Sequence, residues 1–236
     1  VMQRSQRLPL ILLGCGSNNV TEILMSTPLN RVLVLVIACL AFWSMPGSGA
    51  QYEEGVHYQI LDPQAPLSTS GDGIEVSEYF SYGCGHCFQF DPVLTAWLET
   101  LPKDVVFDRT PAIWNDYYGN LAQTYYTLKA MDLLESLHLP VFEAIHIKRK
   151  NLSKQGTMAD FLEESGVEPA TFAKVFNSFG VRMSLQQAEA RGRAYRASGV
   201  PTLIVNGKYR IEARGAGSTR DMLKVAEFLI QLERES

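Results

Sequence analysis

Two cysteines separated by two residues place the strongest single constraint on what this chain can fold into. Cys84 and Cys87 stand in the segment 81–88, after the apolar segment 74–80 and before the amphipathic segment 88–98. The first pattern predicts a buried strand and the second a helix. A C-x-x-C motif at such a junction is typical of a redox site. The unpaired N–H groups and the dipole of a helix N-terminus favour the thiolate, which is the nucleophile in disulfide exchange.

The rest of the chain supplies further strands and a long helical region. Strands are predicted at 105–109, at 202–205 and at 208–211, with a short edge strand at 58–61. Asn206-Gly207 predicts a tight hairpin between two of them. Helical spacing of apolar residues appears in the groups Leu121, Tyr125, Leu128 and Met131; Val141, Phe142 and Ile145, with a helix starting at Pro140; Met158, Phe161 and Leu162; Phe172, Val175, Phe176 and Phe179; and, after a helix over 181–197, Leu223, Ala226, Leu229 and Ile230.

Four motifs resemble the DsbA family of bacterial periplasmic thiol:disulfide oxidoreductases. The segment 78–87 is similar to the family's active-site segment, 198–202 and 205–209 to its later motifs, and 51–55 to the start of its mature proteins. The resemblance keeps the family's order from about residue 51 to the C-terminus. It implies an α/β protein with a thioredoxin-like fold and an inserted all-helical domain.

The domain organisation follows from the resemblance and from an N-terminal leader. The apolar run 32–43, after a short basic stretch and before small residues, predicts a signal peptide at 25–50 with cleavage after Ala50. This run is shorter than the roughly 20 residues that span a membrane. Residues 1–24 are interpreted as an upstream extension from a misassigned start. The thioredoxin-like domain is expected at 51–112 and 186–236, and the helical insertion at 113–185.

Cysteine usage indicates a catalytic pair in an exported protein. Of four cysteines, Cys15 and Cys39 lie in the leader region, so after cleavage only Cys84 and Cys87 remain. A dithiol without an internal competitor favours redox catalysis over a structural disulfide, and we expect the periplasm as its location. A lipoprotein-like box ending at Cys39 leaves a lipid anchor as an alternative. The net charge of −4 and one short basic run, 148–150, give no indication of nucleic-acid binding.

A zinc site or an inert cysteine pair is the alternative reading of the motif. Zinc requires four ligands, usually with a second closely spaced Cys or His pair. The histidines are His57, His86, His138 and His146, and they supply no such motif. We therefore predict a redox site that needs no metal and no organic cofactor.

Two residues between the cysteines bear on the redox potential. His86 is expected to donate a hydrogen bond to the Cys84 thiolate and, when charged, to neutralise it. This stabilises the reduced form and makes the disulfide a stronger oxidant. The alternative is that His86 is merely an exposed residue of the first helical turn. Gly85 departs from the family, whose members typically have Pro here. By resemblance to proteins with Cys-Gly-His-Cys, we expect a weaker oxidant than relatives with Cys-Pro-His-Cys.

Glu78 and the Val200-Pro201 pair complete the predicted site. A buried Glu78 would have a raised pKa and could exchange a proton with Cys87, as the matching acid of the family implies; alternatively it lies at a sheet edge in water. In thioredoxin-like folds a cis proline faces the dithiol. Val200-Pro201 matches this position, so an extended peptide could pair with the backbone of Val200.

The predicted function is donation of the Cys84–Cys87 disulfide to newly exported proteins through a mixed disulfide at Cys84. The expected partners are reduced or unfolded exported proteins and, by resemblance, a DsbB-like membrane quinone reductase; we expect a monomer. The alternatives are a reductase or isomerase of the same fold, and a thiol-based metal chaperone. A glutathione-transferase-like enzyme is disfavoured, because such relatives commonly replace the first cysteine.

Overall fold

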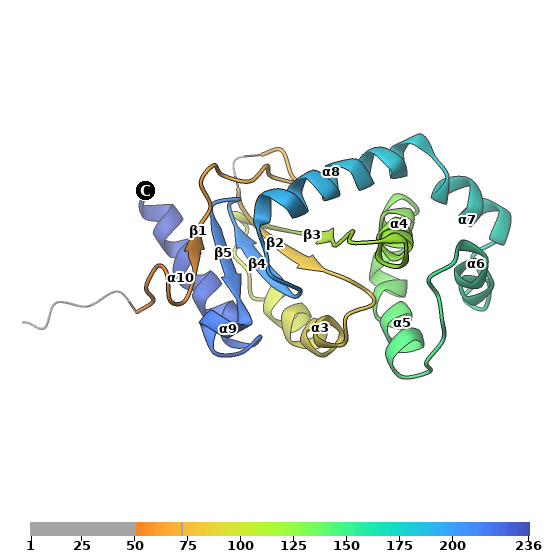
Figure 1. The fold of residues 1–236 in the computed structure, drawn as a ribbon, viewed down its shortest axis with the longest axis horizontal. Coiled ribbons are helices and arrows are strands. Elements are labelled where there is room, and N and C mark those ends of the chain that lie inside the picture. The colour runs from red at the N-terminus through yellow and green to blue at the C-terminus, as the bar shows by residue number, and fades with distance from the viewer. Residues whose placement is uncertain (1–50, 72) are drawn as a thin grey trace, which may run out of the picture. The chain divides into compact units, whose positions relative to one another are not determined.

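Figure 1 shows the computed structural model of the protein, which describes residues 51–71 and 73–236. The predicted signal peptide, the upstream extension, Cys15 and Cys39 lie outside the described residues. Within the described residues, no helix has the length and apolar character needed to cross a membrane.

A five-stranded sheet forms the centre of the described part of the chain, in the order β1-β5-β4-β2-β3. Strands β2 and β3 are parallel and are joined through helix α3, which confirms the predicted β-α-β unit. The other neighbouring pairs are antiparallel. The strands are β1 (Gln59–Ile60), β2 (Ile74–Phe80), β3 (Val105–Pro111), β4 (Thr202–Val205) and β5 (Tyr209–Glu212).

The predicted hairpin joins β4 to β5. Asn206 and Gly207 have φ angles of 51° and 63°, as a type I′ turn requires. A Cβ atom at Gly207 would lie 2.3 Å from the carbonyl oxygen of Ala65, so the close approach of the N-terminal segment requires glycine here. The short strand β1 occupies the sheet edge beside β5, as predicted.

Helices cover both faces of the sheet. The apolar side chains of α3 (Gly85–Leu98) and α10 (Asp221–Glu235) share one core cluster with Val76 and Leu203 of the sheet. All four residues predicted to form the inner face of the last helix are buried there. The opposite face packs against α8 (Phe179–Tyr195) through Tyr195. Figure 1 shows α8 and α3 on opposite sides of the sheet.

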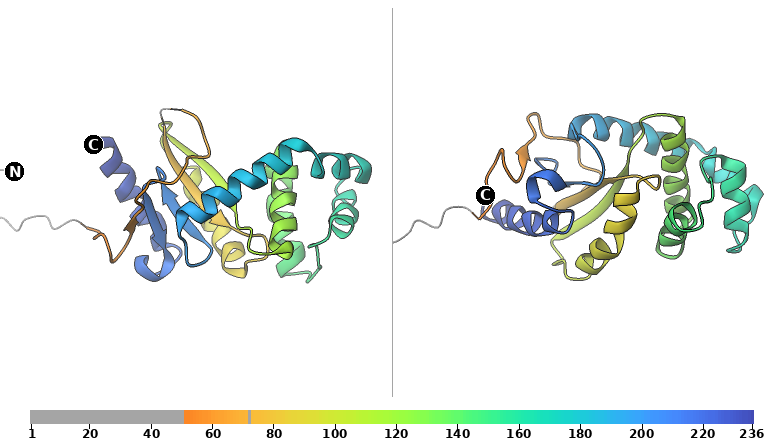
Figure 2. Two further views of the ribbon diagram at one scale, coloured as in Figure 1. Left: turned by 45° about the horizontal axis from the view of Figure 1, so that its top comes forward. Right: turned by 60° about the horizontal axis from the view of Figure 1, so that its bottom comes forward.

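The inserted helices form a separate apolar cluster that reaches the C-terminal end of β2 at Phe80. Figure 2 shows them grouped together at one end of the described part. The helices are α4 (Asp116–Ala130), α5 (Leu134–His146), α6 (Gln155–Glu163) and α7 (Pro169–Phe176), and a short α9 (Ala213–Ala216) follows β5.

Two sequence-based helix assignments are wrong. Helix α5 begins at Leu134, and Pro140 lies inside it rather than at its start. The buried stripe of Leu137 and Val141 is continuous across the proline, so packing against the other helices outweighs the lost backbone hydrogen bond. Phe179 does not share the buried face of α7. It is the first residue of α8 and is 69% exposed.

Helix α8 passes from the inserted helices to the sheet, because it lies against both α4 and β3. The boundary that we expected between 185 and 186 therefore falls within one continuous helix. We retain 113–185 as the proposed extent of the inserted domain, with the remainder of α8 packed on the sheet.

Candidate active site

Cys84 caps the N-terminus of α3. It is the N-cap residue with an extended backbone, and its Sγ accepts a hydrogen bond from the backbone N–H of Cys87 at 3.2 Å. The preceding turn is closed by the N–H of Cys84, which donates to the carbonyl oxygen of Ser81 at 3.0 Å. Both cysteines are free thiols; Cys84 is half-buried, whereas Cys87 has no exposed surface. One sulfur is thus open to attack and the other is protected.

The surroundings move the two thiol pKa values in opposite directions. The side-chain hydrogen bond from Cys87 lowers the pKa of Cys84, and it outweighs the opposing effect of partial burial. The backbone N–H groups of Cys87 and His86 and the charge of His86 lower this pKa further, to about 6. Burial, the contact with Cys84 and the charge of Glu78 raise the pKa of Cys87 well above its usual value. Cys84 is therefore the thiolate at neutral pH, and Cys87 keeps its proton.

His86 and Gly85 lie on the exposed first turn of α3. His86 lines a groove of about 260 Å³ together with the loop that carries Val200 and Pro201. The side chain of His86 is exposed, as the alternative reading expects, and its charge contributes to the lowered pKa of Cys84. The predicted hydrogen bond from the His86 ring to the Cys84 thiolate stays a prediction. Gly85 is the first helical residue, a position that accepts proline, and a Cβ atom there would meet only His146 Nδ1, at 3.9 Å.

The Val200–Pro201 peptide bond is cis, as predicted, and its loop faces Cys84. The Sγ of Cys84 lies 3.4 Å from the carbonyl oxygen of Val200, to which it donates when the thiol is protonated. This carbonyl is the acceptor group that an extended peptide beside Cys84 would meet. Residues 84 and 200 are thus brought together although 116 positions separate them.

Glu78 is buried at the centre of the sheet. It lies on β2, between β4 and β3, and is 2% exposed, so the alternative of an acid at a sheet edge in water is wrong. Arg109 Nε donates to Glu78 Oε2 at 2.8 Å. Burial raises the pKa of Glu78 to about 7, against the opposing effect of Arg109. The charge of Glu78 also contributes to the raised pKa of Cys87.

Sequence reasoning missed a buried polar network behind the cysteines. Arg109 Nη2 donates to Asp91 Oδ1 at 2.9 Å, and His138 Nε2 lies 3.2 Å from the same oxygen. His138 Nδ1 in turn lies 2.8 Å from the hydroxyl of Tyr82. Two signals were available: Asp91 is one helical turn after Cys87, and the parallel register pairs Arg109 with Glu78. No local pattern identifies His138.

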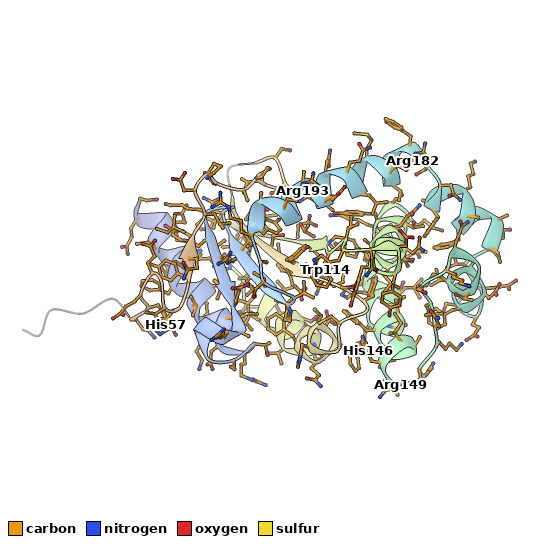
Figure 3. The ribbon with its side chains drawn as sticks, viewed as in Figure 1. His57, Trp114, His146, Arg149, Arg182 and Arg193 are labelled. Atoms are coloured by element: carbon orange, nitrogen blue, oxygen red, sulfur yellow. The ribbon has the colours of Figure 1, made fainter. Side chains whose placement is uncertain are left out.

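A second histidine of α5 holds the active-site loop from outside. His146 lies 2.8 Å from the carbonyl oxygen of Tyr82 through Nε2, and its ring stacks on Phe88 with centroids 5.3 Å apart. Figure 3 labels His146 near the end of α5. The inserted helices therefore contact the segments on both sides of the C-x-x-C motif.

No group of three or more His, Cys, Asp or Glu side chains in the described ranges is arranged to hold a metal ion. The groups that the structure places around the site are the two thiols, the buried acids Glu78 and Asp91, and the charge of Arg109.

Comparison with known proteins gives one family throughout. A family model described as a DSBA-like thioredoxin domain matches residues 115–225. The thiol:disulfide interchange protein DsbA of Pseudomonas aeruginosa is 38% identical over 205 residues, which cover 87% of this chain and 97% of that protein. The DsbA of Azotobacter vinelandii is 39% identical over 189 residues, covering 80% and 88% of the two chains.

Solved structures agree. The crystal structure of Pseudomonas aeruginosa DsbA superposes with a TM-score of 0.74 at 40% identity, covering 78% of this chain and 95% of that one. The oxidoreductase DsbA from Xylella fastidiosa gives a TM-score of 0.73 at 31% identity, with coverage of 78% and 98%. The chain therefore belongs to the DsbA family of thiol:disulfide oxidoreductases.

Proposed function

We propose that this oxidoreductase donates the Cys84–Cys87 disulfide to reduced, newly exported proteins in the periplasm. The observation that carries the proposal is the pairing of an accessible Cys84, whose pKa is lowered to about 6, with a buried Cys87 whose pKa is raised. A stabilised Cys84 thiolate favours the reduced form of the enzyme. It thereby makes the oxidised form a disulfide donor.

The reaction begins on the exposed sulfur. A substrate thiolate attacks Cys84 Sγ and forms a mixed disulfide, while the Cys84–Cys87 bond breaks and its electron pair leaves on Cys87. Cys87 then takes up the proton held by Glu78, the adjacent acid with a pKa of about 7. A second substrate thiolate attacks the substrate sulfur of the mixed disulfide, and Cys84 leaves as a thiolate. The substrate has lost two electrons, which the enzyme holds as its dithiol.

Substrate binding is assigned to the groove beside the cis loop. The backbone of Val200 and Pro201 offers a strand-like edge to an extended peptide, and His86 lines the same groove. Main-chain pairing is tolerant of sequence, which suits an enzyme that meets many unfolded chains. We also assign Gly85 to substrate binding, because it adds no side chain to the first turn of α3.

Further catalysis requires reoxidation of the dithiol by a partner. Membership in the DsbA family supports a DsbB-like membrane quinone reductase in that role. We also propose that the protein acts as a monomer and that the signal peptide is removed after Ala50. N-terminal sequencing of the exported protein tests the cleavage site, and a lipid-modified Cys39 would contradict it.

The reduction potential decides the direction of the reaction. Equilibration of the purified protein with glutathione buffers measures it, and a value of about −120 mV, which is known for a DsbA, would indicate a dithiol oxidase despite Gly85. A value near about −180 mV would indicate an isomerase, and one near about −270 mV a reductase.

Trapping tests the assignment of the attacked sulfur. The variant Cys87→Ala should accumulate a mixed disulfide when its Cys84 thiolate attacks a peptide cysteine supplied as a disulfide with glutathione, which leaves as its thiol, whereas Cys84→Ala should not. Accumulation in Cys84→Ala instead would reverse the roles. A metal chaperone would be identified by stoichiometric Cu(I) after purification without chelator.

A further inference from the structure

Two buried carboxylates share one cation behind the cysteines. Arg109 spans them with its guanidinium group, donating from Nε to Glu78 Oε2 and from Nη2 to Asp91 Oδ1. Both acids are almost completely buried, and Arg109 is largely so. A buried site with two negative charges and one positive charge favours the uptake of one proton by one of the acids. The contacts with Arg109 alone do not determine which acid takes it.

His138 makes the two acids unequal, because it contacts Asp91 and not Glu78. Its Nε2 lies 3.2 Å from Asp91 Oδ1, at an angle outside that of a well-directed hydrogen bond. An ionised carboxylate only accepts hydrogen bonds, so the N–H of a neutral ring belongs on Nε2. Nδ1 is then free to accept from the hydroxyl of Tyr82 at 2.8 Å. The Tyr82 hydroxyl accommodates this tautomer, in which an N–H dipole points at Asp91.

We propose that His138, although it belongs to the inserted helices, is a positioning residue of the redox reaction: it keeps Asp91 ionised and so directs the shared proton to Glu78. Each acid accepts one hydrogen bond from Arg109, and Asp91 additionally faces the N–H dipole of His138. Glu78 is also the acid whose charge acts on Cys87. The use of this proton in catalysis rests on the function proposed above, but the location of the proton on Glu78 does not.

The titration behaviour expected from these surroundings agrees with the contacts. Burial raises the pKa of Asp91, but His138 and Arg109 outweigh burial and leave it below the usual value. The pKa of His138 is lowered, chiefly by burial, which fits a neutral ring at pH 7. The charged and titratable groups facing this network are Cys84 and Cys87 from the start of α3, Arg109 from β3, Tyr125 from α4 and Tyr82 from the active-site loop.

Carbon-13 NMR of the side-chain carboxyl groups in the reduced protein tests the proposal directly. In the parent protein the titration near pH 7 should belong to Glu78, and Asp91 should stay ionised into the acidic range. In His138→Phe, which keeps an aromatic ring but has no N–H, the pKa of Asp91 should rise by about one unit or more, the effect of one hydrogen bond to a charged group. Asp91 should then account for part of the carboxyl titration near pH 7.

Two further variants separate the contacts of His138. His138→Gln can place an amide N–H where Nε2 lies, so Glu78 should keep the proton in this variant. It also serves as the control for a general disturbance of the fold by His138→Phe. Tyr82→Phe removes the hydroxyl but leaves His138 beside Asp91, so Glu78 should keep the proton. The proposal is overturned if Asp91 titrates in His138→Phe as in the parent, or if Tyr82→Phe alone moves the proton to Asp91.

The functional consequence has its own measurement. The rate at which a substrate thiolate displaces Cys87 from the disulfide, measured against pH, should show the Glu78 titration in the parent and in His138→Gln. The same titration should be weaker in His138→Phe. If Glu78→Gln leaves this profile unchanged, the proposed proton transfer to Cys87 fails, while the NMR result still decides whether His138 places the proton.

Discussion

The low pKa of Cys84 predicts a change of slope in the reduction potential as the pH is varied. Below about pH 6 reduction of the disulfide takes up two electrons and two protons, because both thiols are protonated. The potential of a two-electron couple falls about 30 mV per pH unit for each proton taken up, so the slope should be about −59 mV. Above this pH Cys84 stays ionised, only Cys87 takes up a proton, and the slope should become about −30 mV.

The size of the effect at pH 7 follows from the same pKa. A thiol with an ordinary pKa near 8.5 is almost fully protonated at pH 7, whereas one at about 6 is about nine-tenths ionised. The difference stabilises the reduced form by at most about 1.4 kcal/mol. Because Cys84 is partly exposed and solvent screens these interactions, we expect about 1 kcal/mol, or about 20 mV. The stabilisation is complete above about pH 8.5 and is lost as the pH falls through 6.

Glutathione equilibration between pH 5 and 8.5, followed by the fluorescence or mass of the two redox forms, measures the slope. The absorbance of the thiolate at 240 nm measures the pKa of Cys84 independently. Glu78→Gln serves as the control, since it removes the other group that titrates near neutral pH. A single slope of about −59 mV over the whole range, with a thiolate midpoint above pH 8, would refute the reasoning.

Substitutions at four residues test other parts of the site. Glu78→Gln should slow proton delivery to Cys87 and abolish the rate dependence near pH 7; a rate profile that matches the parent would remove this acid from the mechanism. Cys87→Ala should raise the pKa of Cys84 because the donating S–H is lost, whereas Cys87→Ser should raise it less, as thiolate absorbance would show. Arg109→Met leaves two buried carboxylates without a cation and should lower the free energy of unfolding at pH 8 by about 3–5 kcal/mol in urea titrations; a loss below about 1 kcal/mol would count against the network. Gly85→Pro should raise the reduction potential, and an unchanged or lower value would contradict the effect expected for this position.

Local chemistry explains where the sequence was a sufficient guide. The strand, turn and helix around Cys84 were predictable because an apolar run, a C-x-x-C motif and an amphipathic helix are encoded by neighbouring residues. The hairpin at Asn206 was predictable because a type I′ turn requires positive φ at both central positions. The parallel β-α-β unit followed from the order of these elements. Family resemblance then supplied the cis bond before Pro201.

Helix boundaries in the inserted region depended on packing instead. Pro140 carries the local signal of a helix start, yet α5 continues through it because Leu137 and Val141 are buried together. Phe179 has the spacing of the α7 stripe, but a new helix begins there and turns its ring to solvent. At Pro140 a local preference was overridden by packing, whereas Phe179 is separated from α7 by Ser178, whose side chain accepts from the N–H of Val181 and caps α8.

The sequence by itself therefore determined the fold family and the redox motif, because their signals lie in short stretches of neighbouring residues. Only the tertiary structure decided the electrostatic environment. It buried Glu78, gave Arg109 two acids to bind, and brought His138 from the inserted helices to Asp91. The pKa of a buried group depends on charges that surround it in space, and those charges come from segments that no periodicity or spacing connects.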